Sequence, residues 1–498
     1  MRLRNFKHTY STFSCVVFIL MFAAASIQLT IAQQLLWQRV FDSGVSDLAK
    51  GVAVDRWGNI IVTGRSSRET TGGDCLTIKY NPTGDTIWIR WYDSTFYDGA
   101  NAVTTDHSDN IIIAGDIWFD STNADIHIVK YNPEGNILWT RTYSNGEKSV
   151  GEFGCGVAVD SKNNIVVTGR TNAKTTLFGA YITLKYDSSG NLLWMRTYDA
   201  GWEDYARDVA VDNSDNVIVT GYSNGAMNWD WCTIKYSPDG DILWVRRYDV
   251  ALDDKADGVT CDKDGNVIVV GRLGQSPTKY AAIVKYSPAG DTLWTKLFVR
   301  PVPLDGLMNF ADVATDESGN IYTAGLHVLW DNGKGWKDYY IVKCNPQGDT
   351  VWTFRYDYDH VDEASGIVLD RSGNIVVTGT TNRSPEVGEQ NYLTIRIKDL
   401  VNLIGNEPSL AKKFILYPNY PNPFNASTII RYDVSTSIHV HIAVYDLLGR
   451  QVSVLVNEYR LPGSYQAIWD ASRFSSGVYV ARFVAGNSLG VQKLILMK

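Results

Sequence analysis

Short runs of consecutive apolar residues, many of them β-branched, recur between residues 35 and 400 and are separated by polar turns rich in Asp, Asn and Gly. Runs such as Ile60–Thr63 and Ile165–Thr168 are apolar or β-branched at every position, so apolar and polar residues do not alternate. Strands of this kind belong to sheets that are covered on both faces. No segment shows the periodicity of an amphipathic helix. The pattern therefore predicts an all-β protein built from small sheets packed against one another.

One unit of sequence recurs seven times: an apolar strand ending in Asp, a short turn containing Asn, and a β-branched run ending in Gly, as in GVAVDRWGNIIVTG. The repeated aspartates, spaced by 50 to 54 residues, are Asp55, Asp106, Asp160, Asp212, Asp262, Asp316 and Asp370. Six copies continue into a second hairpin in which a turn Gly precedes a Trp by four positions, such as Gly84 and Trp88. Each unit therefore reads as four strands, and a period near 50 residues is typical of a propeller blade.

The seventh copy ends with a third strand near Tyr392 and has no Trp strand, whereas LLWQRVF at Leu35–Phe41 is a Trp strand without a unit. We expect this fragment to complete the last sheet from outside, which predicts a seven-bladed β-propeller closed by an N-terminal outer strand. Residues 35 to about 400 resemble bacterial β-propeller repeat proteins. The Gly–Trp spacing is similar to the tryptophan-docking motif of quinoprotein propellers, which implies only a structural use of these Trp residues.

The first 32 residues have the form of a secretory signal peptide. Arg2, Arg4 and Lys7 precede an apolar run, Val16–Ala25, and small and polar residues follow up to Ala32. The run is too short to span a bilayer, and no later segment is long and apolar enough, so an integral membrane protein is not expected. We expect the mature chain to begin near Gln33.

Charge and cysteine content exclude several classes of function. Removing the signal peptide and its three positive charges changes the net charge of −8 to about −11, which disfavours nucleic acid as a partner. The cysteines after the signal peptide show no CxxC spacing and are odd in number. We interpret them as single strand and loop residues, neither a disulfide framework nor a metal site. They are Cys75, Cys155, Cys232, Cys261 and Cys344.

The pattern changes after residue 400. Residues 401–413 read as a linker, and residues 414–498 read as a separate small β-sandwich of immunoglobulin-like size, with strands separated by Gly, Pro and Ser turns. The motifs YPNYPNPFNASTIIRYDV, VYDLLGRQVSVLV, GSYQAIWDASRFSSGVYVARF and QKLILMK closely resemble the type A sorting domain of type IX secretion. Many members have Pro where this chain has Ala426. The resemblance implies Sec transport to the periplasm, export across the outer membrane by the type IX machinery, and a tail that is often removed, with the protein released or attached to the surface.

An acid recurs at the start of nearly every expected innermost strand. If these carboxylates formed a ring at the channel mouth, they could hold a hard cation such as calcium. Calcium is the one cofactor that the sequence suggests. Alternatively, each carboxylate accepts backbone N–H bonds within its own loop. The acids are Asp47, Asp98, Glu152, Asp204, Asp254 and Asp362.

The longer, variable loops gather on one face and are rich in aromatic residues, which suit stacking on sugar rings or docking of a protein. The strongest candidates are Trp118, Trp202, Tyr205, Trp229, Trp330 and Trp336; Phe96, Tyr97, Phe119, Trp231 and Tyr339 accompany them. No catalytic residues are predicted. The sequence therefore favours a secreted module that binds carbohydrate or protein, with a polysaccharide-degrading enzyme or a structural adhesin component as alternatives.

Overall fold

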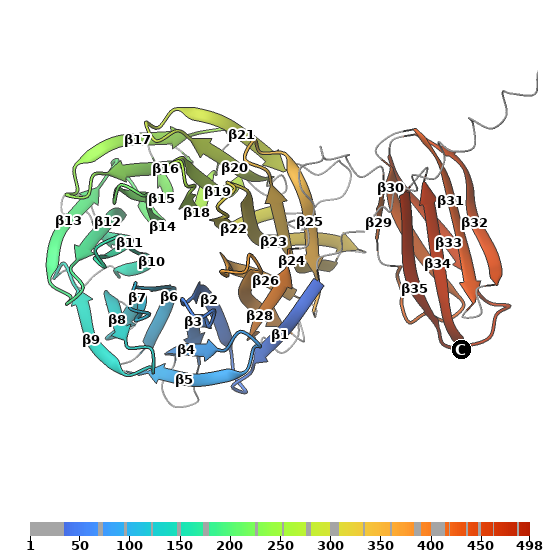
Figure 1. Ribbon diagram of the computed structural model, residues 1–498, viewed down its shortest axis with the longest axis horizontal. Coiled ribbons are helices and arrows are strands. Elements are labelled where there is room, and N and C mark those ends of the chain that lie inside the picture. Colours follow the sequence, from blue (N-terminus) through green and yellow to red (C-terminus); the bar gives the residue numbers. More distant parts are fainter. Residues whose placement is uncertain are drawn as a thin grey trace, which may run out of the picture. The chain divides into compact units, whose positions relative to one another are not determined.

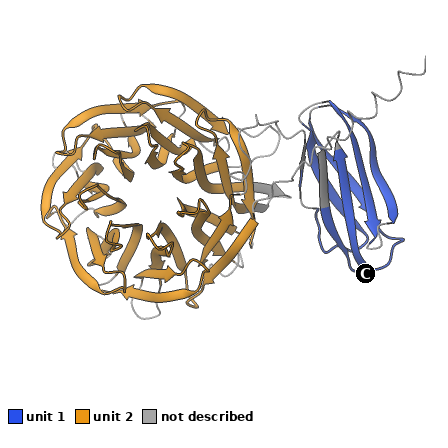
Figure 2. Cartoon of the chain, in the orientation of Figure 1, with its two compact units in different colours: residues 1–31, 404–498 blue, residues 32–403 orange. Residues whose placement is uncertain are grey.

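The computed structural model divides the described part of the chain into two compact units, residues 32–403 and a tail unit at residues 404–498 (Figure 2). The signal-peptide prediction, residues 1–32, lies outside the described residues. No helix in the described residues is long and apolar enough to cross a membrane. The described ranges are 34–67, 73–93, 97–120, 123–146, 151–172, 179–224, 228–250, 253–274, 280–298, 308–331, 334–358, 361–382, 390–399, 414–417, 419–434, 437–446, 450–461, 463–485 and 488–498.

The larger unit contains five four-stranded antiparallel sheets in which strands pair in chain order. The sheets follow one another around a common centre (Figure 1). Their strands are β2 (Asp47–Val54), β3 (Ile60–Ser66), β4 (Asp74–Tyr80), β5 (Thr86–Tyr92); β6 (Tyr97–Thr105), β7 (Ile111–Trp118), β8 (Ala124–Tyr131), β9 (Ile137–Tyr143); β10 (Phe153–Val159), β11 (Ile165–Asn172), β12 (Gly179–Tyr186), β13 (Leu192–Tyr198); β14 (Asp204–Val211), β15 (Val217–Asn224), β16 (Trp229–Tyr236), β17 (Ile242–Tyr248); β18 (Lys255–Cys261), β19 (Val267–Leu273), β20 (Tyr280–Tyr286) and β21 (Thr292–Phe298).

The remaining strands of this unit form one eight-stranded sheet with the order β1-β28-β27-β26-β24-β23-β22, and β25 pairs with β24. Its two halves are joined by a single parallel pair, Lys337 with Val361. The expected pairing of the N-terminal fragment is present, since β1 runs antiparallel to β28 with Trp37 opposite Arg396 and Phe41 opposite Tyr392. The strands are β22 (Met308–Thr315), β23 (Ile321–Asp331), β24 (Lys334–Cys344), β25 (Thr350–Tyr356), β26 (Val361–Leu369), β27 (Ile375–Asn382), β28 (Gln390–Lys398) and β1 (Gln34–Phe41).

Apolar side chains from adjacent sheets form shared cores, as the unbroken apolar runs predict. One core combines Ile61 and Trp88 of one sheet with Val103 and Ile113 of the next. Ile60, Ile61 and Val62 are fully buried although they are consecutive, which requires cover on both faces of the strand. Burial of each such side chain stabilises the fold by about 1.5–3 kcal/mol.

The repeated Asp organises the tight turn between the first two strands of each repeat. Asp55 Oδ1 accepts the backbone N–H groups of Trp57 (3.0 Å) and Asn59 (2.9 Å), and Asn59 Nδ2 donates to Asp55 Oδ2 (2.8 Å). The residue before this Asn has a positive φ in all seven copies, which explains why Gly, Asp and Asn occupy the position. These residues are Gly58, Asp109, Asn163, Asp215, Gly265, Gly319 and Gly373.

The Trp of each outermost strand fastens its sheet to the next one. Trp88 Nε1 donates to the carbonyl oxygen of Pro133 (3.1 Å), and Arg90 Nε donates to that of Gly135 (2.8 Å). Lys79 Nζ also donates to Pro133 O (3.2 Å) and forms a buried ion pair with Asp55 (3.0 Å). The same Trp bond occurs at Trp37, Trp139, Trp194, Trp244 and Trp294. The structural use of these residues is confirmed.

Trp352 is the exception. Its Nε1 is buried and has no hydrogen-bond partner among the residues that the structure describes. At this position the adjacent half of the eight-stranded sheet has no hairpin turn before its outermost strand. That strand, β1, comes from the N-terminal side of the unit. Asp399 lies there instead and accepts hydrogen bonds from Lys343 Nζ (2.6 Å) and Tyr322 Oη (2.7 Å).

The tail unit is also all-β and has a three-stranded sheet, β29-β30-β33, and a four-stranded sheet, β32-β31-β34-β35. Tyr432 of the first sheet packs with Ile442 and Phe483 of the second, so the two sheets share a core. Its strands are β29 (Phe414–Leu416), β30 (Ser427–Val434), β31 (Ile438–Asp446), β32 (Gln451–Arg460), β33 (Gly463–Asp470), β34 (Gly477–Ala485) and β35 (Ser488–Leu496).

Candidate functional site

The innermost strand of every repeat contains one β-bulge, always at the same register. In β2 the pairing with β3 shifts between Ala49 and Gly51, which leaves Lys50 as the extra residue. A bulge leaves one residue unpaired and redirects its side chain. The corresponding bulge residues are Lys50, Asn101, Cys155, Arg207, Asp257, Ala311 and Ser365.

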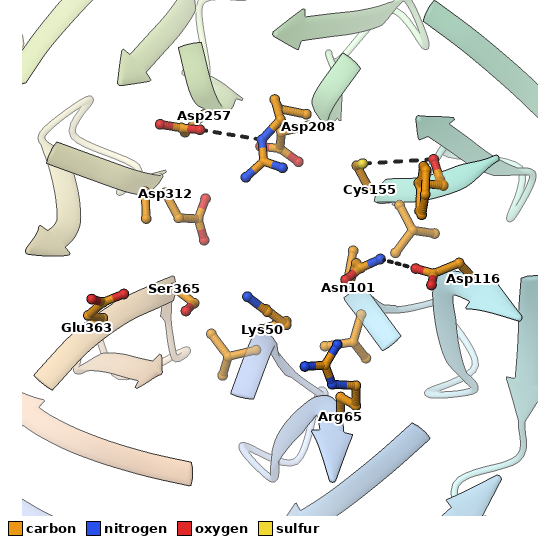
Figure 3. Close-up of a pocket in the computed structure, with 18 of the residues that line it drawn as sticks. Lys50, Arg65, Asn101, Asp116, Cys155, Asp208, Asp257, Asp312, Glu363 and Ser365 are labelled. Atoms are coloured by element: carbon orange, nitrogen blue, oxygen red, sulfur yellow. Dashed lines mark hydrogen bonds and ion pairs between the residues drawn. The ribbon is translucent and has the colours of Figure 1, made fainter. Parts of the chain in front are cut away.

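All seven bulge residues line one central cavity with a volume of about 830 Å³ (Figure 3). They differ in charge and size from repeat to repeat, although the strands that carry them have nearly the same sequence pattern. None of these residues was predicted from the sequence. The available signal was their position, three residues after the recurring acid, where all seven repeats carry a different residue, as they also do at the position directly after the acid.

The recurring acids, in contrast, are absent from the lining of this cavity. Asp47 accepts the backbone N–H of Ser43 (2.8 Å), and Asp204, Asp254 and Asp362 accept the N–H of the residue four positions earlier at 2.7–2.8 Å. Glu152 accepts the N–H of Asn145 (3.1 Å) and the hydroxyl of Thr171 (2.7 Å), and Asp98 is buried. This geometry supports the loop-capping alternative. Calcium binding stays a prediction.

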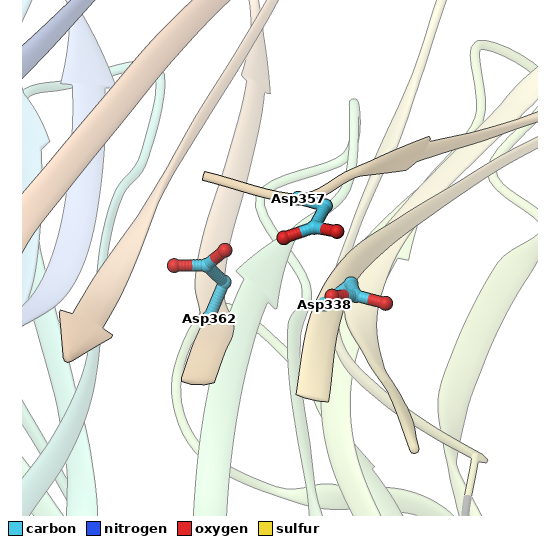
Figure 4. Close-up of side chains that lie close together, drawn as sticks. All are labelled: Asp338, Asp357 and Asp362. Carbon is cyan, nitrogen blue, oxygen red and sulfur yellow. The ribbon is translucent and has the colours of Figure 1, made fainter. Parts of the chain in front are cut away.

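Asp362 also belongs to a group of three carboxylates with Asp338 and Asp357, whose nearest oxygens lie within 4.8 Å of one another (Figure 4). Arg355 donates to Asp338 and lies 3.6 Å from Asp357. Burial raises the pKa of Asp338 to about 6, while the charge of Arg355 opposes this rise. The guanidinium therefore already supplies the positive charge that a cation would bring.

Three of the candidate aromatic residues, Tyr97, Trp118 and Tyr205, line the central cavity. Trp118 lies in contact with Tyr97 and Phe153, with ring centroids 6.0 and 5.5 Å apart, and all three line the cavity. Tyr205, on the neighbouring part of the lining, stacks on Tyr222 at 5.2 Å. The cavity thus has an aromatic wall formed by residues from β6, β7, β10, β14 and β15.

The other aromatic candidates lie elsewhere. Trp229 contacts Tyr222 (5.0 Å) behind the cavity lining, and Trp202 is 54% exposed. Trp330 and Trp336 lie on β23 and β24 in paired backbone, and their side chains are outside the described part; Phe96 is also outside it. Phe119 is exposed, as predicted. The interpretation of Trp231 and Tyr339 as loop residues is wrong, because β16 and β24 extend through them and bury both in sheet cores.

Most acidic groups of the cavity are engaged by neighbouring donors. Asp116 accepts hydrogen bonds from Trp118 Nε1 (2.6 Å) and Asn101 Nδ2 (2.8 Å), and burial raises its pKa to about 6. Asp208 accepts the N–H groups of Val209 and, from the next sheet, Val259, both at 2.8 Å. Burial and the charge of Asp312 raise the pKa of Asp208.

Asp312 repeats this arrangement two sheets further on. It accepts the N–H groups of Val313 (2.7 Å) and Ile367 (2.8 Å), and burial raises its pKa. Asp257 lies 3.4 Å from Arg207, and Lys337 donates to Glu363. These acids therefore brace the inner strands or pair with cations.

Two cations of the lining have no such partner. Lys50 and Arg65 form neither a hydrogen bond nor an ion pair with any described residue, and the guanidinium of Arg65 lies over the Tyr97 ring at 4.8 Å. Burial lowers the pKa of Lys50, and the positive charges of Arg207 and Arg65 lower it further. The cavity thus combines an aromatic wall with two unpaired cations.

Comparison with known proteins identifies the tail. Residues 419–497 match the secretion system C-terminal sorting domain, so the predicted sorting domain is confirmed. Such a domain of the type IX system indicates export to the cell surface or beyond.

The other similarities to known proteins are more distant. A 133-residue stretch is 35% identical to an uncharacterized WD repeat-containing protein, L264, of Acanthamoeba polyphaga mimivirus, and the match covers 24% of this chain and 9% of that protein. A protein of unknown function from Bacteroides caccae is 13% identical, with 59% of this chain and 93% of that chain covered and a TM-score of 0.37. PorZ, a surface component of the type IX secretion system of Porphyromonas gingivalis, is 11% identical, with 90% and 59% covered and a TM-score of 0.42.

Proposed function

We propose that the protein is an exported seven-bladed β-propeller that binds a carbohydrate in its central cavity. The observation that carries this proposal is the set of seven bulge residues, one from each repeat, which differ chemically while their scaffold repeats. Variable side chains held on a rigid scaffold are typical of a binding site.

The count of seven blades depends on how the eight-stranded sheet is divided. Its halves, β22–β25 and β26–β28 with β1, are joined by one backbone pair only, and each half contains one innermost strand with its bulge. Division at this pair gives two four-stranded blades in addition to the five separate sheets. Blade seven then combines three C-terminal strands with β1 as its outermost strand.

The lining of the cavity favours a sugar as the ligand. Tyr97, Trp118, Phe153 and Tyr205 present aromatic surface beside amide, hydroxyl and charged groups. A sugar matches such a lining, because its apolar C–H face packs on an aromatic ring while its hydroxyl groups form hydrogen bonds. A volume of about 830 Å³ lies within the usual range for small-ligand sites.

A glycan array followed by titration calorimetry tests this function. Substitution Trp118→Ala should weaken binding about tenfold or more, equivalent to about 1.4 kcal/mol. Substitution Trp57→Ala is the matched control, because this Trp is 71% exposed in a tight turn and absent from the cavity lining. If no glycan binds, carbohydrate recognition is wrong. Release of reducing ends from a bound polysaccharide would instead indicate a degrading enzyme.

Export is proposed to proceed in two steps, by a signal peptide at residues 1–32 and then by the tail unit. Deletion of Phe414–Lys498 should leave the protein in the periplasm, as measured by cell fractionation, because the sorting domain would be lost. Attachment of these same residues to an unrelated periplasmic reporter should bring that reporter to the surface. Continued export of the truncated protein would contradict the assignment of this step to the tail.

A further inference from the structure

We infer that the central cavity selects an acidic saccharide, whose carboxylate or sulfate group binds between Lys50 and Arg65. This inference rests on the proposed function and specifies the class of ligand. The two side chains come from adjacent strands of one sheet, β2 and β3, and both line the cavity. Figure 3 shows them on the same side of it.

No described acid forms an ion pair with these cations, although Glu363 acts on Lys50 and Asp116 acts on Arg65 at longer range. Asp116, Asp208 and Asp312 accept two hydrogen bonds each, Asp257 lies beside Arg207, and Glu363 accepts from Lys337. Lys50 and Arg65 are the charged lining residues without a hydrogen bond or ion pair in the described part of the chain. Lys50 is exposed to the cavity and Arg65 is half-buried, so both groups can bind an anionic ligand without first breaking an ion pair.

An aromatic ring holds the side chain of Arg65, and the bulge positions the backbone of Lys50. The Arg65 guanidinium lies over the ring of Tyr97, a cation–π contact that leaves its N–H groups available. Lys50 is fixed at its backbone by the bulge between Ala49 and Gly51. Arg65 and Arg207 repel Lys50 and Glu363 attracts it, so an anion between Lys50 and Arg65 would reduce the remaining repulsion.

Two buried oxygen atoms of the lining indicate what the rest of the ligand must offer. Asp257 Oδ2 and Asn309 Oδ1 are buried atoms of cavity-lining residues, and neither has a hydrogen-bond partner among the residues described. In Figure 3 Asp257 lies across the cavity from Arg65. Both atoms can only accept hydrogen bonds. A ligand with an anionic group at one end and hydroxyl donors at the other satisfies both sides of the cavity.

An acidic saccharide combines these features with ring faces for the wall of Tyr97, Trp118 and Phe153. A neutral glycan would leave both cations unpaired. An acidic peptide would supply the charge and N–H donors, but its acidic side chains have no apolar ring face to pack on the aromatic wall.

The test uses titration calorimetry on the full-length purified protein with four probes: an oligogalacturonate, a chondroitin sulfate oligosaccharide, a neutral cello-oligosaccharide and an oligoglutamate peptide. We expect one or both acidic saccharides to bind at least about tenfold more tightly than the neutral one. Comparison of the first two probes distinguishes carboxylate from sulfate recognition.

Substitutions Lys50→Met and Arg65→Met should each reduce acidic saccharide binding about tenfold or more, whereas Lys263→Met, an exposed residue of a tight turn, should not. Thermal melting controls for folding, and Lys50→Met should not lower the Tm, because it removes an unpaired charge. Equal binding of acidic and neutral sugars, or undiminished binding by Lys50→Met, would overturn this inference and leave the proposed function intact. Binding of the peptide alone would overturn both in favour of a protein partner, and binding of no probe together with a blank glycan array would overturn the proposed function itself.

Discussion

Trp37 lies opposite Arg396 in the pairing of β1 with β28, and both side chains donate to the same carbonyl oxygen, that of Pro82, at 3.1 and 2.5 Å. The first residue belongs to the start of the larger unit, the second to its end, and the acceptor to the turn of the adjacent sheet. One carbonyl group thus ties the two ends of the unit to each other and to their neighbour.

The bond between an outermost Trp and the next turn should be measurable by comparing two substitutions. Trp88→Phe removes the bond to Pro133 O, whereas Trp352→Phe removes an N–H group that has no partner in the described residues. Both changes reduce the size of the ring equally. We expect Trp88→Phe to cost about 1 kcal/mol more in the free energy of unfolding, measured by urea denaturation. Equal costs would show that these indole bonds add nothing to stability.

Asp399 should be essential for the stability of the contact between the two halves of the eight-stranded sheet. It neutralises Lys343 at 2.6 Å, and both side chains are at most 2% exposed. Asp399→Asn would leave the Lys343 ammonium buried without a carboxylate, at an expected cost of about 3 kcal/mol. Asp85→Asn is the control, because Asp85 is 70% exposed and 3.8 Å from Arg39, and it should leave the thermal melt nearly unchanged. A thermal melt that is unchanged by Asp399→Asn would contradict this assignment.

Glu152 should make the protein less stable above neutral pH. Burial raises its pKa to about 7, although hydrogen bonds from Thr171 and Asn145 oppose the rise. The folded state therefore binds a proton that the unfolded state has lost at about pH 4.3, so stability falls as the pH rises from about 4 to 7. Glu152→Gln should flatten the difference in unfolding free energy between pH 5 and 8 by about 2 kcal/mol. Glu134→Gln, at an exposed turn, should leave the pH profile unchanged; an unaltered profile for Glu152→Gln would refute the account.

Bulge residues should tolerate substitutions that their neighbours do not. Ser365 and Ala364 both line the cavity, but only Ala364, which is 5% exposed, belongs to a core with Ile367 and Leu393. Ser365→Gln should shift the Tm by no more than about 2 °C. Ala364→Gln should cost about 2 kcal/mol or more, because it forces an amide and extra volume into a packed core. Similar losses for both variants would show that the bulge does not direct Ser365 into the cavity.

The sequence predicted the elements that depend on local chemistry. Asp55 and Asn59 bond to each other within one turn, so their spacing alone identified the hairpin, and a count of strands identified β1 as the partner of β28. The tail was recognisable from contiguous motifs. Each of these features depends on residues that are close together in the sequence or on the number of strands.

The site depended on register, which the sequence does not display. A bulge at Lys50 shifts the pairing by one residue and turns that side chain to the cavity, but the letters around it resemble an ordinary strand. The conspicuous acid at Asp47 attracted a functional interpretation, yet it caps the N–H of Ser43. Similarly, Trp231 and Tyr339 seemed to lie in loops because the extent of β16 and β24 is set by pairing with neighbouring strands.

The bulge has an evolutionary consequence. Because the backbone pairing forms each bulge, the side chain at that position can change without changing the strand, although Arg207 and Asp257, which contact each other, are expected to change together. New ligand specificities would then arise by point mutations at the bulge positions, while the inherited strands stay unchanged.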